Sequence, residues 1–266
     1  MFKTVTDGQL EYLVAENLPA RHGFTTRYGG VSTGCLASMN IGTHRDDRPE
    51  NVFANYRILG NAIGFDPQKL VLSKQTHTDN VLVVGTPQWG AGLFAPELPE
   101  CDGLITNTPG TALTVFTADC TPILLCDPVT GAVGAVHAGW RGTAADIAGK
   151  AVRKMADAFG CRPENIRAAI GPNIAQCCFE TDGDVPEAML RAFGEAAKQY
   201  VRAYGDKYYV NLKEINALAL LRAGVTDIVI MPHCTCCDPD RFWSHRVVGQ
   251  KRGSQGAIIV CKEGNP

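Results

Sequence analysis

Two short segments in the middle of the chain place reactive side chains at the ends of apolar runs. One ends in Asp119-Cys120, and the other begins at His137 and continues Ala138-Gly139-Trp140-Arg141-Gly142. A third segment, Lys74-Gln75-Thr76-His77, supplies a second imidazole. A thiol and two imidazoles can bind one metal ion, whereas a thiol beside one imidazole can act as a nucleophile with its base. The sequence predicts one of these two chemistries where buried strands meet the surface.

The residue types suit a zinc ion. Catalytic zinc sites keep three protein ligands and leave a fourth position for water or substrate. His77, Cys120 and His137 would supply two neutral nitrogens and one thiolate, a donor set that suits Zn²⁺. Because the three residues are distant in the sequence, their spacing alone does not establish the site.

The alternative is a cysteine nucleophile. It needs only Cys120 and His137 within hydrogen-bond reach, with Asp119 or Asn40 as the group that orients the imidazole. This hypothesis leaves His77 without a role. Asp119 itself has two interpretations: it accepts a hydrogen bond from a histidine ligand, or it caps the local turn.

Arg141 lies where a helix is expected to begin, directly before Gly142 and Thr143. The free N–H groups of a helix start, next to a guanidinium, favour binding of an anion. The alternative is an arginine that pairs with a nearby carboxylate. Trp140 either stacks on a ring-shaped substrate or packs half-buried against the fold.

The eleven cysteines are odd in number and irregular in spacing, which does not indicate a disulfide framework. The segment His233-Cys234-Thr235-Cys236-Cys237 contains a Cys-x-x-Cys, and Cys177-Cys178 lies elsewhere. Together they allow a second, structural zinc site, although one Cys-x-x-Cys without a matching partner is a weak signal. Buried, inert thiols are the default interpretation.

Composition excludes several classes of partner. The 266 residues carry a formal net charge of -2, with a pI near 6.3. Nucleic acid or an anionic membrane is therefore not favoured as a partner, whereas a nucleotide-sized substrate needs only one or two arginines. The N-terminus does not resemble a signal peptide, and no stretch has the roughly 18 apolar residues of a membrane helix. We expect a cytoplasmic protein; its oligomeric state is not readable from the sequence.

The expected elements form one domain over residues 1–266, without repeats or linkers. Helices are predicted at 47–64, 143–159, 185–204 and 212–223, the last with Asn211 and Glu214 as a cap-like pair. Strands are predicted at 112–116, 122–126, 132–136, 166–170, 227–231 and 257–261, with a hairpin turn at 127–131. Loops are expected at 27–34 and 87–99. Runs of strands without regular βαβ alternation favour an α+β fold with mixed sheets flanked by helices.

Several segments resemble the YfiH-like family, long labelled multicopper polyphenol oxidase (laccase) and now associated with purine nucleoside phosphorylase activity. The matching segments are TTRYGGVS at 25–32, SMNIG at 38–42, KQTH at 74–77, CDGLIT at 101–106, TADC at 117–120, HAGWRG at 137–142, IGP at 170–172 and FWSHR at 242–246. Near the end, where members carry a plain Thr-Gly-Arg, this chain reads Lys251-Arg252-Gly253-Ser254-Gln255.

The resemblance implies a YfiH-like fold and one zinc ion bound by His77, Cys120 and His137. It also implies phosphorolysis of adenosine, inosine or 5′-methylthioadenosine, with adenosine deamination as a companion activity. Zinc would activate water for the deamination, and Arg141, with Arg27 or Arg246, would hold phosphate. Asn40 is a further expected substrate contact, and Asp119 is the candidate for protonating the leaving purine.

The laccase label is tested by counting histidines. A multicopper oxidase needs a histidine-rich cluster, usually built from His-x-His pairs. The chain has six histidines, and no two of them lie two positions apart. The sequence therefore favours zinc over copper. The alternatives to the zinc purine enzyme are a Cys120–His137 hydrolase, a copper-dependent polyphenol oxidase and a non-catalytic purine-binding protein.

Overall fold

The apolar runs in the middle of the chain become strands that are covered on both faces. In the computed structural model, which describes residues 1–262, all residues of β8 (Thr121–Cys126) and β9 (Val133–Ala138) are buried. Leu124 faces one hydrophobic core, whereas its neighbours Ile123 and Leu125 face another. Because side chains alternate along a strand, these two strands need packed layers on both sides.

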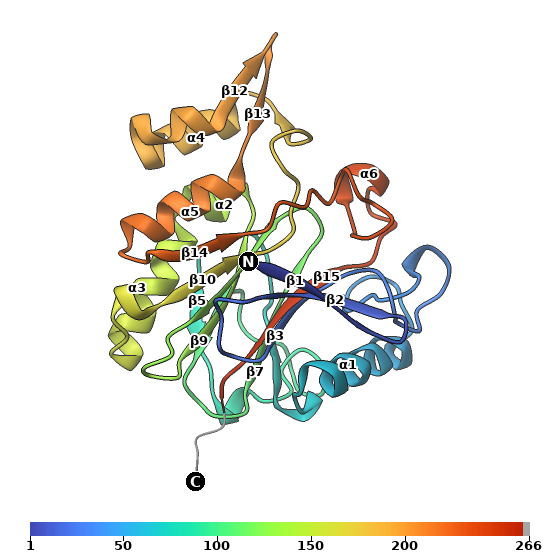
Figure 1. The fold of residues 1–266 in the computed structure, drawn as a ribbon. Coiled ribbons are helices and arrows are strands. Elements are labelled where there is room, and N and C mark those ends of the chain that lie inside the picture. Colours follow the sequence, from blue (N-terminus) through green and yellow to red (C-terminus); the bar gives the residue numbers. More distant parts are fainter. Residues whose placement is uncertain (263–266) are drawn as a thin grey trace.

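Two six-stranded mixed sheets stack face to face and share one of these cores (Figure 1). The first has the order β1-β2-β3-β15-β7-β4, and the second β14-β10-β8-β9-β6-β5. The pairs β4–β7, β5–β6 and β10–β14 are parallel, and the other neighbours are antiparallel. The remaining strands of the two sheets are β1 (Phe2–Asp7), β2 (Leu10–Ala15), β3 (His22–Thr25), β4 (Leu70–Leu72), β5 (Val81–Val83), β6 (Gly103–Thr106), β7 (Ala112–Thr117), β10 (Arg167–Ile170), β14 (Asp227–Ile230) and β15 (Gln255–Val260).

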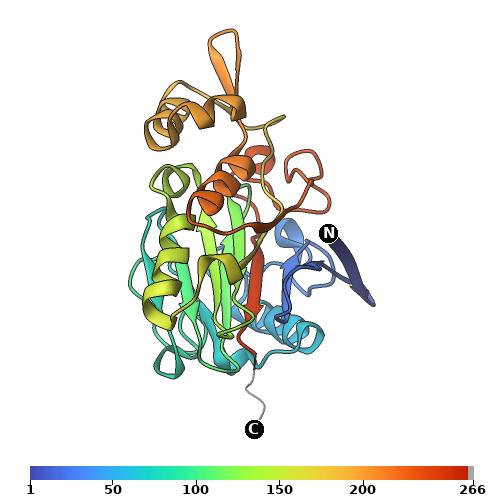
Figure 2. The same cartoon turned by 60° about the vertical axis from the view of Figure 1, so that its left-hand side comes forward.

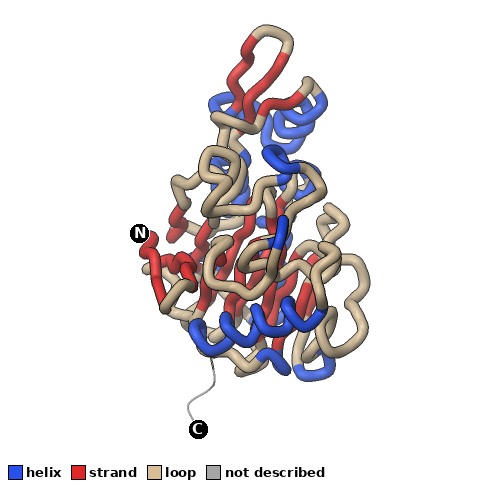
Figure 3. Tube along the Cα trace, turned by 90° about the vertical axis from the view of Figure 1, so that its right-hand side faces the viewer, coloured by secondary structure: helices blue, strands red, loops and turns tan. Residues whose placement is uncertain are grey.

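Helices cover the two outer faces. Helix α1 (Pro49–Ile63) packs Tyr56 and Leu59 against the outer face of the first sheet. Helices α3 (Ile147–Phe159) and α5 (Leu212–Arg222) cover the second sheet. The layers therefore run helix, sheet, sheet, helices. Figure 2 shows helices on opposite sides of the strands, and Figure 3, seen from the side of α1, shows this helix in front of the strands.

Shorter elements complete the chain. They are α2 (Trp140–Ala144), α4 (Asp184–Phe193), α6 (His245–Val248), and a third sheet of order β11-β13-β12 with β11 (Glu180–Thr181), β12 (Val201–Tyr204) and β13 (Lys207–Val210). The β12–β13 hairpin projects from the body at the top of Figure 1. Within residues 1–262, no helix has the length and apolar character needed to cross a bilayer.

The predicted α+β class with mixed sheets and flanking helices is confirmed. The predicted strands and the helices at 47–64 and 212–223 are present with small shifts of their ends. Gly64, with φ 87°, ends α1, and Asn211 caps α5 by accepting from the Glu214 N–H.

Two helix predictions are wrong. The helix expected at 143–159 is two helices, α2 and α3, because Asp146 adopts a left-handed conformation with φ 59° between them. The helix expected at 185–204 stops at Phe193, and Gly194 follows with φ 61°. Residues 194–200 then form a 3-10 helix and 201–204 form β12.

Candidate metal centre and active site

The three candidate ligands meet at one end of the sheet stack. His77 lies in the loop between β4 and β5, Cys120 in the connection from β7 to β8, and His137 near the end of β9. The chain passes from the first sheet to the second at Cys120, and the β8–β9 register pairs Pro122 with His137. Adjacent strands of one hairpin therefore deliver the thiol and the buried imidazole to the same edge.

Their geometry fits a small tetrahedral ion. One ligand atom from each of the three residues lies within 4.8 Å of the others. Cys120 Sγ is 3.8 Å from His77 Nε2, and the two imidazole rings meet edge to face with centroids 5.1 Å apart. Tetrahedral zinc with bonds of about 2.0–2.3 Å separates its ligand atoms by about 3.3–3.8 Å. Three ligands leave a fourth position for water or substrate.

Asp102, directly before β6, holds both histidines. Its carboxylate, fully buried, accepts a hydrogen bond from His137 Nδ1 at 2.7 Å, which turns His137 Nε2 toward Cys120. The same carboxylate accepts from the backbone N–H groups of Thr76, His77 and Thr78 and from the Thr78 hydroxyl, at 2.8–3.2 Å. One carboxylate thus fixes the tautomer of one ligand and the loop that carries the other.

The electrostatics favour a thiolate. Burial alone raises the pKa of the Cys120 thiol, but the charge and hydrogen bonds of His137, then those of His77, outweigh it and lower that pKa. Burial lowers the pKa of His137, but Cys120 and Asp102 outweigh it and raise that pKa. A cysteine ligand must be a thiolate and a histidine ligand must be neutral. The lowered Cys120 pKa therefore assists metal binding near neutral pH, whereas the raised His137 pKa means that this imidazole releases a proton when the ion binds.

Gly139 makes room for the ligands. A Cβ at this position would lie 2.8 Å from His77 Cδ2 and 3.3 Å from Cys120 Sγ. His77 itself has a left-handed backbone with φ 64°, which the Asp102 hydrogen bond to its N–H stabilises. Gly139, the first glycine of the His-Ala-Gly-Trp-Arg-Gly motif, is therefore required because the backbone approaches the site closely.

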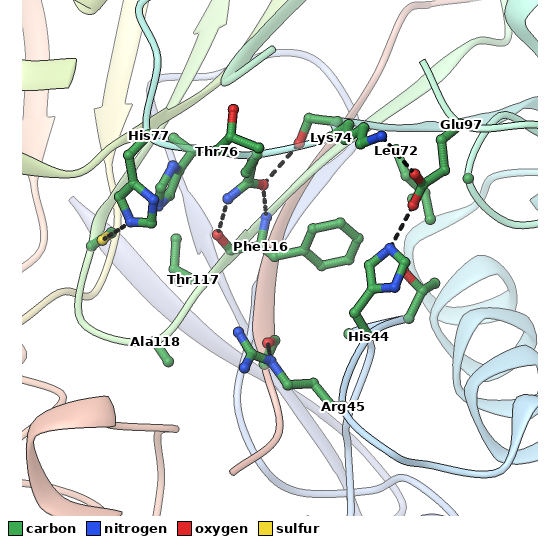
Figure 4. A pocket seen from close by; sticks show the side chains of 18 of the residues that line it. His44, Arg45, Leu72, Lys74, Thr76, His77, Glu97, Phe116, Thr117 and Ala118 are labelled. Carbon is green, nitrogen blue, oxygen red and sulfur yellow. Dashed lines mark hydrogen bonds and ion pairs between the residues drawn. The ribbon is translucent and has the colours of Figure 1, made fainter. Parts of the chain in front are cut away.

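A cavity of about 360 Å³ opens beside the three ligands (Figure 4). His77, Cys120 and His137 line it together with Arg45 and Arg252. Arg45 is half-buried and donates to Ser254 Oγ, and Arg252 is buried and donates to the Gly253 carbonyl. Within residues 1–262 neither guanidinium forms an ion pair with a carboxylate; the arginines that do are Arg48, Arg153, Arg162, Arg167 and Arg241.

Burial, and then the like charge of Arg45, lower the pKa of Arg252 to about 10, although Asp119 and Cys120 act in the other direction. A guanidinium nevertheless stays charged at neutral pH. Two guanidinium groups without an ion-paired carboxylate in one cavity favour binding of an anion.

An aromatic ring and a polar group form another part of the wall. Phe116 lies between Arg45 and the loop that carries Lys74 and His77 in Figure 4. Gln75 holds that loop by accepting from the Phe116 N–H at 2.6 Å and donating to the Phe116 carbonyl at 2.7 Å. At the other side of the view Glu97 pairs with both His44 and Lys74.

The predicted residues Asp119 and Arg246 lie next to this site but do not line the cavity. Asp119 accepts from Thr235 Oγ1 at 2.6 Å and from the Arg246 N–H at 2.7 Å. The Arg246 guanidinium donates to the carbonyls of Cys178 and Glu180. Asp119 therefore links loops around the cysteine.

The other predicted contacts also lie outside the cavity lining. Buried Asn40 binds Asp47 and the N–H groups of Gly42 and Ser254, so Asp102 rather than Asn40 or Asp119 orients His137. Arg27 stacks on Trp243 and donates to the Pro239 carbonyl. Arg141 is exposed and stacks on Trp140.

Sequence reasoning assigned no role to Asp102, Arg45 or Arg252. Asp102 had a usable signal, because a carboxyl residue directly before a buried strand stands at a strand end, where His137 also lies. The β6–β9 register pairs Gly103 with Val136 and so brings Asp102 to His137. Arg252 lies in the segment that departs from the family pattern, and Arg45 lies three residues after the SMNIG segment, outside the matching residues.

Comparison with known proteins agrees with this architecture. Residues 21–262 match the family model described as multi-copper polyphenol oxidoreductase laccase. "Purine nucleoside phosphorylase YlmD" of Geobacillus stearothermophilus is 36% identical over 243 residues, covering 90% of this chain and 88% of the relative. "Purine nucleoside phosphorylase YfiH" of Escherichia coli is 36% identical over 223 residues, covering 84% and 86%.

A solved structure shares the fold over almost the whole length. The crystal structure of hypothetical protein YfiH from Bacillus licheniformis superimposes with a TM-score of 0.92 at 32% identity, covering 97% of this chain and 99% of that one. The resemblance seen in the sequence is thereby confirmed. The chain belongs to the YfiH-like family, whose model carries the name multi-copper polyphenol oxidoreductase laccase.

Proposed function

We propose that this protein is a zinc-dependent purine nucleoside phosphorylase that acts on adenosine, inosine and 5′-methylthioadenosine and also deaminates adenosine. The names of its relatives support a purine nucleoside phosphorylase. The observation that carries the proposal is one cavity lined by a zinc-type ligand set and by two guanidinium groups without carboxylate partners.

Phosphorolysis places definite demands on such a cavity. A phosphate oxygen forms a bond to ribose C1′ while the bond from C1′ to the purine nitrogen breaks, and the departing purine takes up a proton. Arg45 and Arg252 are the proposed phosphate contacts, because they line the cavity and lack anionic partners. Phe116 offers a face on which a purine ring can pack.

His77, Cys120 and His137 would hold the zinc ion, with Asp102 fixing His137. Zinc supplies Lewis acidity, which stabilises developing negative charge and lowers the pKa of bound water, as purine deamination requires. Arg141, Arg27, Asn40 and Arg246 stay predicted as substrate contacts. For Arg141 such a role requires the side chain to leave Trp140.

The test is incubation of the purified protein with adenosine and phosphate, with the products separated by chromatography. Phosphorolysis yields adenine and ribose 1-phosphate in equal amounts, and deamination yields inosine. Cys120→Ala should abolish both, whereas Cys35→Ser, which removes an exposed thiol elsewhere, should not. Release of adenine that is independent of phosphate, or full turnover by Cys120→Ala, would overturn the proposal.

One observation favours a second candidate. Cys120, His137 and Asp102 are arranged as a nucleophile, base and orienting carboxylate, which is also the layout of a cysteine hydrolase. Metal-free protein would then be active in acyl transfer and inactivated by alkylation of Cys120. Binding of adenosine without any product would instead indicate a purine-binding protein, and phenol oxidation that requires copper would indicate a polyphenol oxidase.

The proposed location is the cytoplasm. The eleven cysteines of the described chain are all free in the structure, which fits a reducing compartment.

A further inference from the structure

Four cysteines that the proposed reaction does not use meet on the far side of Asp119. Cys177 and Cys178 lie in the loop after β10, and Cys234 and Cys237 lie in the loop after β14. Strands β10 and β14 are parallel neighbours, so both loops leave the sheet in the same direction. A bridge between Asn173 and Cys234 keeps the loops together beyond the sheet. The fold thus places Cys177 and Cys178 next to the Cys-x-x-Cys of Cys234 and Cys237, for which the sequence alone shows no matching pair.

The spacing of the four sulfur atoms is that of ligands around one ion. All four lie within 4.8 Å of one another. Sγ of Cys237 is 3.6 Å from that of Cys177 and 3.4 Å from that of Cys178, and the latter two are 3.7 Å apart. Tetrahedral zinc with Zn–S bonds of about 2.3 Å places its sulfurs about 3.8 Å apart. In an iron–sulfur cluster the four cysteines are distributed over two or four irons, which requires a wider group of thiolates.

The surroundings supply positive charge and a hydrogen-bond donor. Four thiolates around Zn²⁺ carry a net charge of about −2, which needs compensation. Lys213 is only 5% exposed, and its ammonium donates to the carbonyls of Met231 and His233, immediately before Cys234. Within residues 1–262 it forms no ion pair with a carboxylate. The Ala175 N–H donates to Cys234 Sγ at 3.3 Å.

A buried ammonium without an ion-paired carboxylate is costly, and four thiolates beside it would supply negative charge. We propose that Cys177, Cys178, Cys234 and Cys237 bind one structural Zn²⁺, separate from the ion at His77, Cys120 and His137. The four thiols lose their protons when the ion binds. This assignment does not depend on the proposed reaction.

Zinc bound to the four cysteines would stabilise the loops around the His77–Cys120–His137 site. Thr235, between two of the ligands, donates to Asp119 Oδ1, and Arg246 joins the Cys178 carbonyl to the same aspartate through its N–H. Asp119 directly precedes Cys120 and has a strained backbone with φ 88°. Zinc in the four-cysteine group would therefore hold the two loops that support this turn.

Metal content by mass spectrometry tests the proposal. Wild-type protein reconstituted with zinc and freed of excess should hold about two ions per chain, and Cys120→Ala and Cys237→Ser should each hold about one. Cys236→Ser is the matched control, because Cys236 lies in the same loop but outside the group of four; it should hold about two. The double variant C120A/C237S should hold none.

A second measurement leaves all four cysteines of the proposed site unchanged, so its result does not depend on the folding of a cysteine variant of that site. X-ray absorption at the zinc edge of Cys120→Ala should show four sulfur neighbours at about 2.3 Å. A chelator should lower the melting temperature of Cys120→Ala but not that of C120A/C237S.

Three results would overturn the proposal. They are a Cys120→Ala protein without zinc, equal zinc loss in Cys236→Ser and Cys237→Ser, and an intact mass that shows a disulfide in the group while no metal is bound. Because Cys120→Ala removes the proposed catalytic site, these outcomes do not depend on whether the phosphorylase assay succeeds.

Discussion

Replacing Asp102 with asparagine should weaken zinc binding at the His77–Cys120–His137 site. Oδ1 of Asp102 accepts from His137 Nδ1 and the His77 N–H, and Oδ2 accepts from two N–H groups and the Thr78 hydroxyl. In Asp102→Asn one oxygen becomes an NH₂ group. If it faces His137, the imidazole must accept at Nδ1 and carry its proton on Nε2, where it cannot bind metal. If it faces Thr76 and Thr78, two N–H groups lose their acceptor.

Both orientations have a calculable cost. A fully buried unsatisfied donor costs about 1–3 kcal/mol, so the two N–H groups of Thr76 and Thr78, whose hydrogen bonds are only part-buried, cost at most about 2–6 kcal/mol of stability. Loss of an outer partner of a metal ligand typically lowers metal affinity 10- to 100-fold, equivalent to about 1.4–2.7 kcal/mol. We therefore expect a lower melting temperature and a zinc affinity at least about tenfold weaker.

The assay is competition for zinc between the protein and a chromogenic chelator. The zinc-binding step that the unchanged protein shows and Cys120→Ala lacks gives the affinity of this site. Asp119→Asn is the matched control. It also alters a buried carboxylate next to Cys120, but its amide can still accept from the Arg246 N–H and donate to Thr235 Oγ1. Its zinc affinity should therefore change little. Unchanged affinity in Asp102→Asn, or an equal loss in Asp119→Asn, would refute the role given to Asp102.

Three further predictions follow from contacts in the structure. Gly139→Ala pushes a Cβ against His77 and Cys120, and overpacking of about 1–3 kcal/mol should weaken zinc binding roughly 5- to 150-fold. Gly183→Ala, with 3.7 Å to its nearest neighbour, is the control and should bind normally. Arg252→Ala should raise the KM for phosphate roughly 10- to 150-fold, because a hydrogen bond to a charged group contributes about 1.5–3 kcal/mol. Replacement of the exposed Arg162 by alanine should leave the KM for phosphate unchanged. An equal KM for phosphate in both variants would show that Arg252 does not contact phosphate. Burial lowers the pKa of His22 below 6.5, so below that pH the unfolded chain binds the proton first and stability falls as the pH drops toward the folded pKa. Chemical denaturation between about pH 7 and 5 should therefore show a shallower decline for His22→Gln, by at most about 1.4 kcal/mol per pH unit, and parallel curves would contradict the assignment.

Sequence patterns predicted best those elements in which burial follows one regular pattern from end to end. Strands β8 and β9 are buried on both faces and read as continuous apolar runs, and α1 shows helical spacing with Gly64 at its end. The helix expected at 185–204 failed because an apolar pattern continued across Gly194. A signal for the strand was present: Gly205-Asp206 forms the two-residue turn between β12 and β13, and Gly205 has φ 61°.

The site was only partly predictable for a related reason. The ligand types and the family resemblance identified His77, Cys120 and His137. The partners of those ligands depend on strand register, which no local pattern shows: Asp102 reaches His137 because β6 pairs with β9. Arg45 and Arg252 reach one cavity from positions 207 residues apart, a juxtaposition that only the folded chain reveals. Arginines in recognisable motifs, such as Arg141, instead lie outside the cavity lining.

The most direct measurement of the central claim is phosphorolysis of adenosine during zinc re-addition to metal-free protein. Adenine and ribose 1-phosphate are quantified in parallel with the zinc bound at the site that Cys120→Ala lacks. The account predicts that activity rises in proportion to occupancy of this site, requires phosphate and is absent from Cys120→Ala. Full activity before zinc is added, or no phosphorolysis when the site is full, would contradict it.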